Sequence, residues 1–154
     1  MKIVIGSDHG GFRLKEEIKA FLKKEGHSVT DAGSYDDRPS DYPDFARAIA
    51  EKIMTGKAAR GVLVCGSGVG ACIAANKFPG IRASVCHDTF SAHQGVEDDS
   101  MNVICMGARI IGPRLAEEVV AAFVAARFSN AARHRRRLGK IKDIERTYYR
   151  DDLL

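Results

Sequence analysis

Short apolar runs alternate with segments of helical period along this 154-residue chain, and this alternation constrains the fold more than any other feature. Five apolar runs are interpreted as buried strands, at residues 2–6, 28–32, 61–65, 81–86 and 102–106. A helical segment follows each of them, and a basic sixth helix is expected at about residues 131–149. Such alternation is typical of a parallel sheet with helices on both faces. We therefore predict one α/β domain over residues 1–154, a Rossmann-like three-layer α/β/α fold with a five-stranded parallel sheet.

Composition narrows the setting in which the protein works. No segment approaches the ~20 apolar residues of a membrane span, and the N-terminus reaches a charged residue too soon for a signal peptide. The four cysteines, Cys65, Cys72, Cys86 and Cys105, lie at or near apolar runs, which favours reduced thiols over disulfides. We therefore expect a cytoplasmic protein with no membrane partner.

One stretch joins an apolar strand, a cysteine and a glycine-rich loop. Residues 60–77 read RGVLVCGSGVGACIAANK, so Cys65 ends the strand, three glycines follow, and a helix of small residues begins. Glycines let backbone N–H groups approach an anion closely, and a helix N-terminus adds partial positive charge. Ligands of open α/β sheets bind beyond the carboxyl ends of the strands. Residues 7–11, 65–70 and 107–109 follow strands there, so we expect these three segments to converge on one site.

The sequence of this glycine-rich loop matches some phosphate-binding motifs and lacks the residues that others require. It lacks the Gly-Lys-Ser/Thr of a nucleoside-triphosphate loop, and Ala71 stands where a cysteine phosphatase needs an arginine. It does satisfy Gly-x-Gly-x-x-Ala, and Asp88 lies 22 residues beyond Gly66, near the spacing of a ribose-binding acid. A dinucleotide-binding module is therefore an alternative from a different functional class, although residues 7–11, after the first strand, lack this fingerprint.

Cys65 can be interpreted as a packing residue or as a reactive group. Its position, directly before the glycines and a helix start, favours a reactive group. A free thiol titrates near ~8.5, and a helix N-terminus contributes about 0.3–1 kcal/mol against ~1.36 kcal/mol for one pKa unit. A helix alone therefore cannot fully ionise a thiol, and we interpret Cys65 as a proton-transfer base rather than a permanent thiolate nucleophile.

Basic residues gather near the C-terminus, where residues 133–137 read RHRRR. Arg133 and Arg137 are four residues apart, so they share one helix face and together fit a phosphate. No aromatic residue interleaves with this run, so we expect no nucleic-acid partner. His93 and Glu97 are also four apart, but a polar helix face explains them, and we expect no metal and no other cofactor.

Several motifs, spread over nearly the whole chain, form a specific combination. They are Ser-Asp-His-Gly-Gly at 7–11, Asp-Tyr-Pro at 41–43, Cys-Gly-Ser-Gly-Val-Gly at 65–70, Ala-Ala-Asn-Lys at 74–77, Gly-Ile-Arg-Ala at 80–83, Asn-Val-Ile-Cys-Met-Gly-Ala-Arg at 102–109 and Arg-His-x-x-Arg at 133–137. Together these motifs resemble the ribose-5-phosphate isomerase B family, which also holds allose-6-phosphate isomerases and galactose-6-phosphate isomerase subunits.

The resemblance implies aldose–ketose isomerisation of a sugar phosphate without metal or organic cofactor. It implies a homodimer or homotetramer with active sites at the dimer interface, reached by the C-terminal helix. In this family pattern, Cys65 moves a proton between C2 and C1 through an enediolate, while the backbone of residues 66–70 holds the oxyanion. The implied site residues are Cys65, Ser67 and Asp98 for catalysis, Asp8, His9, Tyr42, Gly66, Ser67, Gly68, Val69, Gly70 and Asp99 for substrate binding, and His9, Arg109, Arg133 and Arg137 for the phosphate.

One position departs from the family pattern. The family usually has a histidine, assigned to opening the sugar ring, where this chain has Asp98. Three interpretations remain open: Asp98 acts as a base for ring opening, His93 or another group replaces the histidine, or the substrate needs little ring opening. We expect ribose 5-phosphate and ribulose 5-phosphate as the substrates. The alternatives are allose 6-phosphate, galactose 6-phosphate or a tetrose 4-phosphate, whose esterified O4 cannot close a furanose ring.

Overall fold

A five-stranded parallel sheet lies at the centre of the computed structural model, which describes residues 1–149. Residues 150–154 of the predicted domain lie outside the described residues. The predicted succession of strands and helices is confirmed. In chain order the elements are β1 (Lys2–Ser7), η1 (His9–Gly11), α1 (Phe12–Lys24), β2 (Ser28–Asp31), α2 (Tyr42–Met54), β3 (Arg60–Cys65), α3 (Val69–Ala75), β4 (Ala83–Val85), α4 (Thr89–Asp99), β5 (Val103–Gly107), α5 (Pro113–Ala125) and α6 (Ala132–Tyr148).

The edge strand β4 is shorter than the sequence predicts. It contains three residues rather than the whole apolar run at 81–86. The amide of Ile81 bonds to the Phe78 carbonyl in a turn, and the amide of Arg82 bonds to the Asn102 side chain. These two amides are therefore held outside the strand ladder, and pairing begins at Ala83.

The strands lie in the order β2-β1-β3-β5-β4, and every neighbouring pair is parallel. The direction of winding reverses between β1 and β3, because β2 and β3 lie on opposite sides of β1. Ser7 of β1 is in register with Val64 of β3, and Cys65 of β3 is in register with Gly107 of β5. The carboxyl ends of these three strands are therefore adjacent, at the switch point where open α/β sheets bind ligands.

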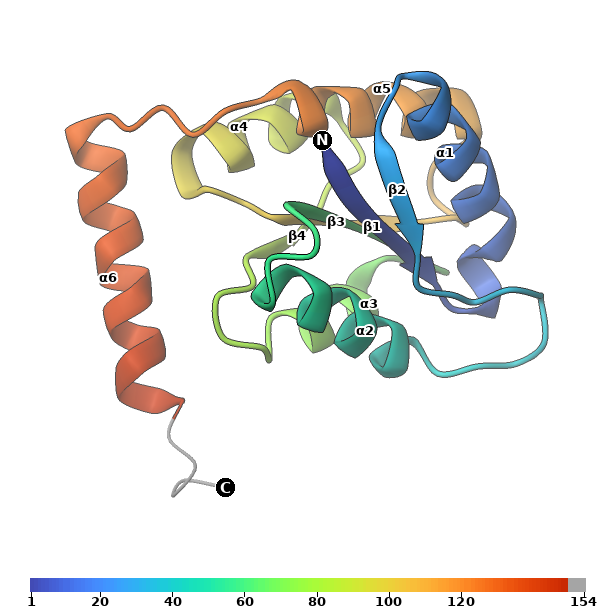
Figure 1. Cartoon of the computed structure of the whole chain (residues 1–154), viewed down its shortest axis with the longest axis horizontal. Coiled ribbons are helices and arrows are strands. Elements are labelled where there is room, and N and C mark those ends of the chain that lie inside the picture. Colours follow the sequence, from blue (N-terminus) through green and yellow to red (C-terminus); the bar gives the residue numbers. More distant parts are fainter. Residues whose placement is uncertain (150–154) are drawn as a thin grey trace.

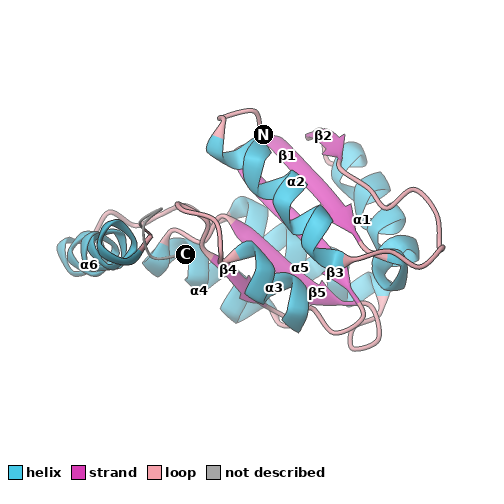
Figure 2. Ribbon diagram, turned by 90° about the horizontal axis from the view of Figure 1, so that it is seen from below, coloured by secondary structure: helices cyan, strands magenta, loops and turns pink. Residues whose placement is uncertain are grey.

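Helices cover both faces of the sheet, as Figures 1 and 2 show: α2 and α3 pack on one face, and α1, α4 and α5 pack on the other. Strand β3 supplies side chains to both layers. Its Val62 and Val64 belong to the core under α1 and α5, whereas its Leu63 and Cys65 belong to the core under α2 and α3. A strand buried on both faces must be apolar throughout, which is why residues 61–65 read as a continuous apolar run.

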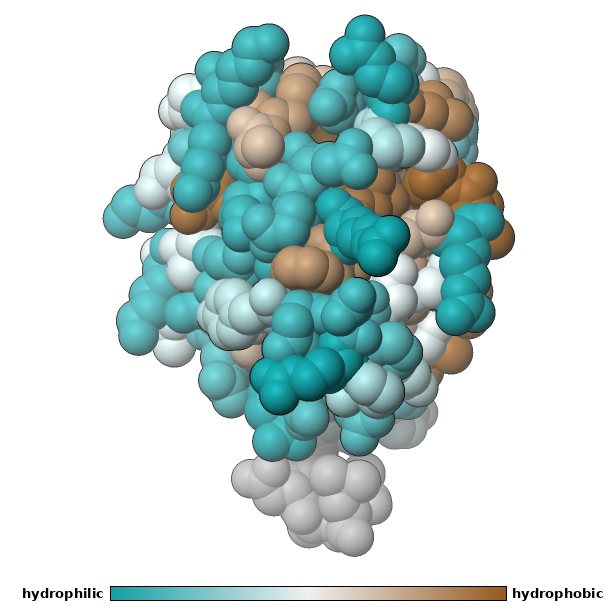
Figure 3. All heavy atoms as spheres, turned by 90° about the vertical axis from the view of Figure 1, so that its right-hand side faces the viewer, coloured by the Kyte–Doolittle hydropathy of each residue, from teal (hydrophilic) through white to brown (hydrophobic). Residues whose placement is uncertain are grey.

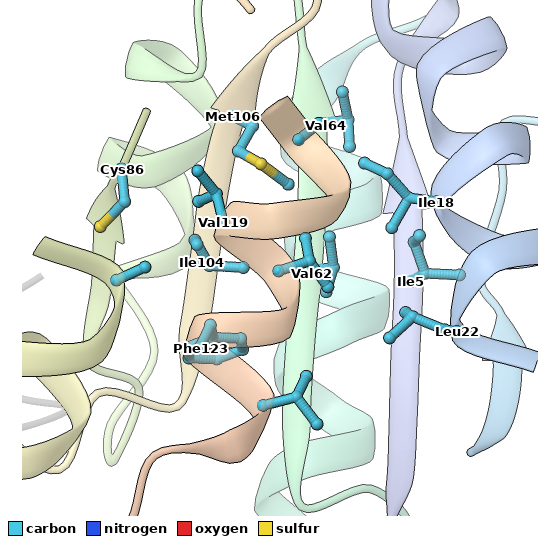
Figure 4. Close-up of a cluster of buried hydrophobic side chains, with 14 of the residues drawn as sticks. Ile5, Ile18, Leu22, Val62, Val64, Cys86, Ile104, Met106, Val119 and Phe123 are labelled. Atoms are coloured by element: carbon cyan, nitrogen blue, oxygen red, sulfur yellow. The ribbon is translucent and has the colours of Figure 1, made fainter. Parts of the chain in front are cut away.

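The larger core lies between α5 and the sheet. Figure 4 shows Val119 and Phe123 of α5 directed at Val62 and Ile104 of the two central strands. All four side chains are fully buried. Burial of such a side chain contributes about 1.5–3 kcal/mol relative to leaving it exposed. This packing holds β3 and β5 firmly in register, and the residues after these strands inherit that fixed position.

Helix α6 stands apart from the three layers (Figure 1). It contacts α4, its Glu145 accepts a hydrogen bond from the Gly80 N–H at 2.7 Å, and the Tyr149 hydroxyl that follows it donates to the Asn76 carbonyl at 2.6 Å. Ile144 and Tyr148 on this helix are 60% and 69% exposed. The helix therefore carries apolar side chains that the layers of its own chain do not cover.

Candidate active site

Cys65 and the loop after it form one wall of a cavity at the carboxyl end of β3. The Cys65 side chain is buried, and its Sγ accepts a hydrogen bond from the Gly68 N–H at 3.0 Å. Gly68 has a φ of +84°, and a Cβ there would lie 3.0 Å from the Met106 carbonyl carbon, so only glycine fits without strain. The Ser67 hydroxyl accepts a hydrogen bond from the Val69 N–H at 3.3 Å. The loop's own backbone thus holds both the sulfur and the hydroxyl.

The residues after β1 bring a carboxylate and an imidazole to the same cavity. Asp8 caps the short helix η1, because its Oδ1 accepts a hydrogen bond from the Gly11 N–H at 3.1 Å. Asp8 is only 8% exposed, whereas His9 is exposed. Nδ1 of His9 lies 3.1 Å from both the N and the O atoms of Ser40. Asp8 is therefore held by its own turn, and His9 is held by a residue from another part of the chain.

Two further side chains complete the lining. Tyr42, at the start of α2, packs against Gly70, where a Cβ would lie 2.8 Å from the tyrosine Cζ. Arg109 follows β5, and its backbone N–H donates to the Gly66 carbonyl at 3.0 Å. A Cβ on Gly66 would lie 3.5 Å from Nε of Arg109. The Arg109 guanidinium thus places positive charge directly beside the glycine-rich loop.

These residues enclose a cavity of about 320 Å³, a size that suits a small phosphorylated molecule. The structure therefore brings together the three segments that we expected to converge. Gly10 and Ile110 also line the cavity: Gly10 lies within the predicted segment 7–11, whereas Ile110 lies one residue beyond the predicted segment 107–109. Each is adjacent in sequence to a predicted site residue, and this adjacency is the signal that could have found them. The lining residues are Asp8, His9, Gly10, Tyr42, Cys65, Gly66, Ser67, Gly70, Arg109 and Ile110.

A second cavity, of about 400 Å³, adjoins the first and shares His9 and Gly10 with it. It extends along α1 and the start of α5 and contains no residue of the glycine-rich loop, so chemistry at Cys65 belongs to the first cavity. Figure 3 views the side of the molecule on which α1 and the loop after β2 lie, and this face is mostly hydrophilic. Such surroundings fit a charged ligand better than an apolar one.

Six predicted site residues do not line this cavity: Gly68, Val69, Asp98, Asp99, Arg133 and Arg137. Gly68 and Val69 belong to the loop that forms the cavity wall, where their amides bond to Cys65 and Ser67. Asp98 and Asp99 end α4, and the two arginines are exposed on α6. Figure 1 shows α6 beyond the β4 edge of the sheet, whereas α1 and the loop after β2 lie toward the other edge. Within one chain the predicted site residues therefore form two separate groups.

The Asp98 carboxylate is bound within its own chain. Its Oδ1 lies 3.4 Å from Nε2 of His134, and its Oδ2 accepts a hydrogen bond from the Gln94 amide at 3.3 Å. His134 is 2% exposed, and its Nδ1 lies 2.6 Å from the Ser129 hydroxyl. His93, which we considered as a substitute for the absent histidine, pairs instead with Glu97 at 3.3 Å. The contact between Asp98 and His134 joins the end of α4 to the start of α6.

Asp88, the acid of the dinucleotide alternative, serves as the N-cap of α4. Its Oδ1 accepts a hydrogen bond from the Ser91 N–H at 2.7 Å. Hydrogen bonds from the backbone and side chain of Ser91 lower the pKa of Asp88 below its ordinary value. Capping a helix explains this aspartate without a ribose.

The thiol of Cys72 has a lowered pKa. A hydrogen bond with Cys105 lowers the pKa of Cys72 to about 7, against the opposing effect of burial. The same bond, together with burial, raises the pKa of Cys105, and burial raises the pKa of Cys86. None of these three cysteines lines the cavity, so Cys65 is the thiol at the site.

The polar groups at the cavity are a thiol, the hydroxyls of Ser67 and Tyr42, a carboxylate, an imidazole and a guanidinium. Such groups can move a proton and bind an anion. Across residues 1–149 we find no cluster of three or more His, Cys, Asp or Glu side chains that could hold a metal ion. In the same part of the chain, each helix is too short or too polar to cross a membrane.

Comparisons with known proteins agree with this geometry. Residues 3–141 match the Ribose/Galactose Isomerase family. The D-erythrulose-4-phosphate isomerase of Pectobacterium atrosepticum is 45% identical over 130 residues, which are 83% of this chain and 85% of that protein. The ribose-5-phosphate isomerase B of Escherichia coli is 42% identical over 144 residues, 94% of this chain and 96% of that one. The structure of Clostridium thermocellum ribose-5-phosphate isomerase B has a TM-score of 0.93 at 46% identity, covering 96% of this chain and 99% of that one.

Proposed function

The chain belongs to the Ribose/Galactose Isomerase family, and we propose that this sugar-phosphate isomerase interconverts ribose 5-phosphate and ribulose 5-phosphate. One observation carries the proposal: the Cys65 thiol lies at a cavity that also holds Asp8, His9 and Arg109. A thiol can move a proton between neighbouring carbons, while the imidazole and the guanidinium can bind a phosphate.

Cys65 is the base in this proposal. In the aldose-to-ketose direction its thiolate removes the proton from C2, the C1–C2 double bond forms, and negative charge moves to O1. The hydroxyl proton then passes from O2 to O1. The Ser67 hydroxyl, held on the same loop by the Val69 N–H, is placed to carry it. The Cys65 thiol finally returns its proton to C1, and O2 becomes the ketone oxygen, so the shift needs no external oxidant or reductant.

Backbone amides of the glycine-rich loop hold the enediolate oxygen in this proposal. The Gly68 and Val69 amides are already used within the loop, on the Cys65 sulfur and the Ser67 hydroxyl. In this proposal the substrate oxygen therefore meets other amides of the loop, those of Gly66 and Ser67. Donors fixed in place before charge develops are the most effective way to stabilise an oxyanion.

We propose that a second subunit completes each active site. Arg133 and Arg137 lie on a helix that projects away from its own cavity and exposes apolar side chains. A two-fold axis brings the same helix of each subunit to the cavity of the other, so that two identical sites form. The phosphate is then clamped by Arg109 and His9 from one subunit and by α6 from the other. Binding energy from this remote phosphate orients the reacting carbons. A homotetramer pairs two such dimers.

Replacement of Cys65 tests the mechanism directly. We expect Cys65→Ala and Cys65→Ser to lower kcat for ribose 5-phosphate by about a hundredfold or more, because the proton-transfer base is gone. The far-ultraviolet circular dichroism spectrum should stay unchanged. Cys72→Ser is the matched control, since it removes a thiol outside the cavity and should leave turnover close to normal. Near-normal turnover by Cys65→Ala would overturn the proposal.

A tetrose 4-phosphate is the second candidate substrate, and Asp98 favours it. This carboxylate is already engaged by His134 and Gln94, and a tetrose 4-phosphate needs no ring opening. A relative at 45% identity is a D-erythrulose-4-phosphate isomerase. Comparing kcat/KM for ribose 5-phosphate, erythrose 4-phosphate, allose 6-phosphate and galactose 6-phosphate decides between the candidates. A strong preference for ribose 5-phosphate removes the tetrose.

A further inference from the structure

Ser40 lies outside the cavity lining but makes three contacts with His9. Its hydroxyl accepts a hydrogen bond from the His9 backbone N–H at 3.0 Å, and its backbone N and O both lie 3.1 Å from Nδ1 of the ring. The two residues are 31 positions apart, and Ser40 is half-buried in the turn-rich segment before α2. Ser40 belongs to none of the motifs found in the sequence.

The ring contacts keep Nδ1 engaged in either protonation state. A bare imidazole nitrogen accepts a hydrogen bond from the Ser40 N–H, whereas a protonated one donates to the Ser40 carbonyl. The imidazole therefore keeps its orientation in either tautomer. With Nδ1 engaged by Ser40, Nε2 remains for a ligand, and it carries the ring hydrogen whenever Nδ1 accepts from the Ser40 N–H.

The segment that carries Ser40 is itself anchored. Lys15 of α1 is fully buried, and its Nζ donates to the Ser34 carbonyl at 2.6 Å and to the Asp31 carboxylate at 2.9 Å. The Ser7 N–H at the end of β1 donates to the Gly33 carbonyl at 2.5 Å. The start of this segment is therefore tied to α1 and β1, the elements on either side of His9.

We propose that Ser40 is a positioning residue for His9. Its hydroxyl fixes the start of η1, and its peptide group directs the ring so that an Nε2–H points into the cavity. There it donates to the phosphate of the substrate. This last step rests on the proposed function, because only a sugar phosphate makes the phosphate the partner of Nε2. The orientation and tautomer of His9 do not rest on it.

Kinetics of Ser40 variants give the first test. We expect Ser40→Ala to raise KM for ribose 5-phosphate about threefold to tenfold, the value of one hydrogen bond, with kcat changed by less than about twofold. Ser40→Thr keeps the hydroxyl and should restore the normal KM. Thr55→Ala deletes a hydroxyl at the far end of α2 and should change neither constant. Unchanged KM in Ser40→Ala, or no rescue by threonine, would overturn the positioning role.

A double-mutant cycle separates positioning from general loss of stability. If Ser40 acts through His9, then adding Ser40→Ala to His9→Ala should raise KM no further than His9→Ala alone. If the double variant instead raises KM by the product of the two single effects, then Ser40 acts independently of His9, and the proposal would be wrong.

Nitrogen-15 NMR of the histidine rings tests the proposal without any turnover. In the wild-type protein, the His9 signal, assigned by its loss in His9→Ala, should show hydrogen on Nε2 and an acceptor at Nδ1. Inorganic phosphate should shift the Nε2 signal, and Ser40→Ala should weaken that response. Hydrogen on Nδ1 alone in the wild-type protein would refute the inference. If the protein isomerises no sugar phosphate, the proposed function fails, whereas the tautomer result still stands or falls by itself.

Discussion

At the scale of single residues, Cys65 and Asp98 differ in the groups that contact their side chains. The sulfur of Cys65 meets one backbone N–H and faces the cavity. The Asp98 carboxylate is held by two side chains, His134 and Gln94, at the junction of two helices. Cys65 is therefore placed to meet a substrate in the cavity of its own chain, whereas Asp98 lies outside that cavity.

Asp98→His is the prediction that belongs to this scale. We expect it to raise kcat for ribose 5-phosphate by about threefold or more and to leave the turnover of erythrose 4-phosphate unchanged. The reason is that an imidazole titrates near ~6.5 and a carboxyl near ~3.9, so an imidazole is the better proton donor at neutral pH. Steady-state kinetics with both substrates measure the effect.

Asp98→Asn is the control, because it removes the titratable group and keeps the shape. Loss of pentose turnover in Asp98→Asn, with tetrose turnover intact, would mean that the native carboxylate already acts as the ring-opening base. No gain in Asp98→His would then be the expected result, and ring opening would not limit the pentose reaction.

At the scale of elements, an ionic cluster around the buried Lys15 ties α1 to β2 and to the segment before α2. Lys15 Nζ lies 2.9 Å from Asp31 Oδ2 and 2.7 Å from Glu16, and Lys19 Nζ lies 2.6 Å from Asp31. Burial alone would raise the pKa of Asp31, but hydrogen bonds from Lys19, Gly33 and Lys15 outweigh it and hold that pKa below its ordinary value. The cluster therefore stabilises the folded chain while Asp31 is ionised.

Asp31→Asn should destabilise the protein at neutral pH. We expect a loss of about 2–3 kcal/mol in the free energy of unfolding, because the buried Lys15 loses one of its two counter-charges. A carboxyl whose pKa is lowered on folding stabilises the fold above its unfolded pKa of ~3.9, and this contribution disappears as the pH falls through the lowered folded pKa. Urea unfolding at pH 7 and at about pH 3, at fixed protein concentration, measures the free energies of unfolding of the wild-type protein and of Asp31→Asn. The difference between them should be smaller at the lower pH.

Asp37→Asn provides the matched control for this comparison. Asp37 pairs with Arg13 at 3.9 Å on the surface, where their side chains are 70% and 88% exposed. Such a pair contributes roughly 0–1 kcal/mol, so this variant should unfold almost like the wild-type protein. Equal stabilities of the two variants at pH 7 would show that the ionic cluster contributes nothing.

At the scale of the whole molecule, the division of the site residues into two groups is the central feature. One group surrounds the cavity at the switch point of the sheet, and the other lies on α4 and α6. If a second subunit joins the groups, every active site draws Cys65 from one chain and Arg133 and Arg137 from another. Inactive variants of the two groups should then complement each other.

Mixed dimers of Cys65→Ala and Arg133→Ala/Arg137→Ala chains test this prediction. Each variant alone should have almost no turnover of ribose 5-phosphate. Co-expression in equal amounts makes about half of the dimers mixed, and each mixed dimer has one intact site and one doubly defective site. We therefore expect about a quarter of the wild-type activity. Activity no higher than the mean of the two pure variants would mean that each chain carries a complete site.

The sequence by itself determined the succession of elements and the segments that reach the site. The spacing of apolar residues and the position of turn residues are local properties of the sequence. Apolar runs therefore predict strands and apolar stripes of helical spacing predict helices, and the alternation of the two predicts a parallel sheet. Carboxyl ends of parallel strands share one edge, which is why the residues after β1, β3 and β5 could be assigned to one cavity in advance. Gly10 lies within one of these predicted segments, and Ile110 directly follows another.

Only the tertiary structure decided which side chains meet across elements. The contact between Ser40 and His9 joins positions 31 residues apart, and the contact between Asp98 and His134 joins two helices. The separation of Arg133 and Arg137 from Cys65 within one chain is a matter of where α6 points. The local period of apolar residues determines which face of a helix or strand is buried. Which residues then become its neighbours depends on strand register, loop path and helix direction, and all three depend on the packing of the whole chain.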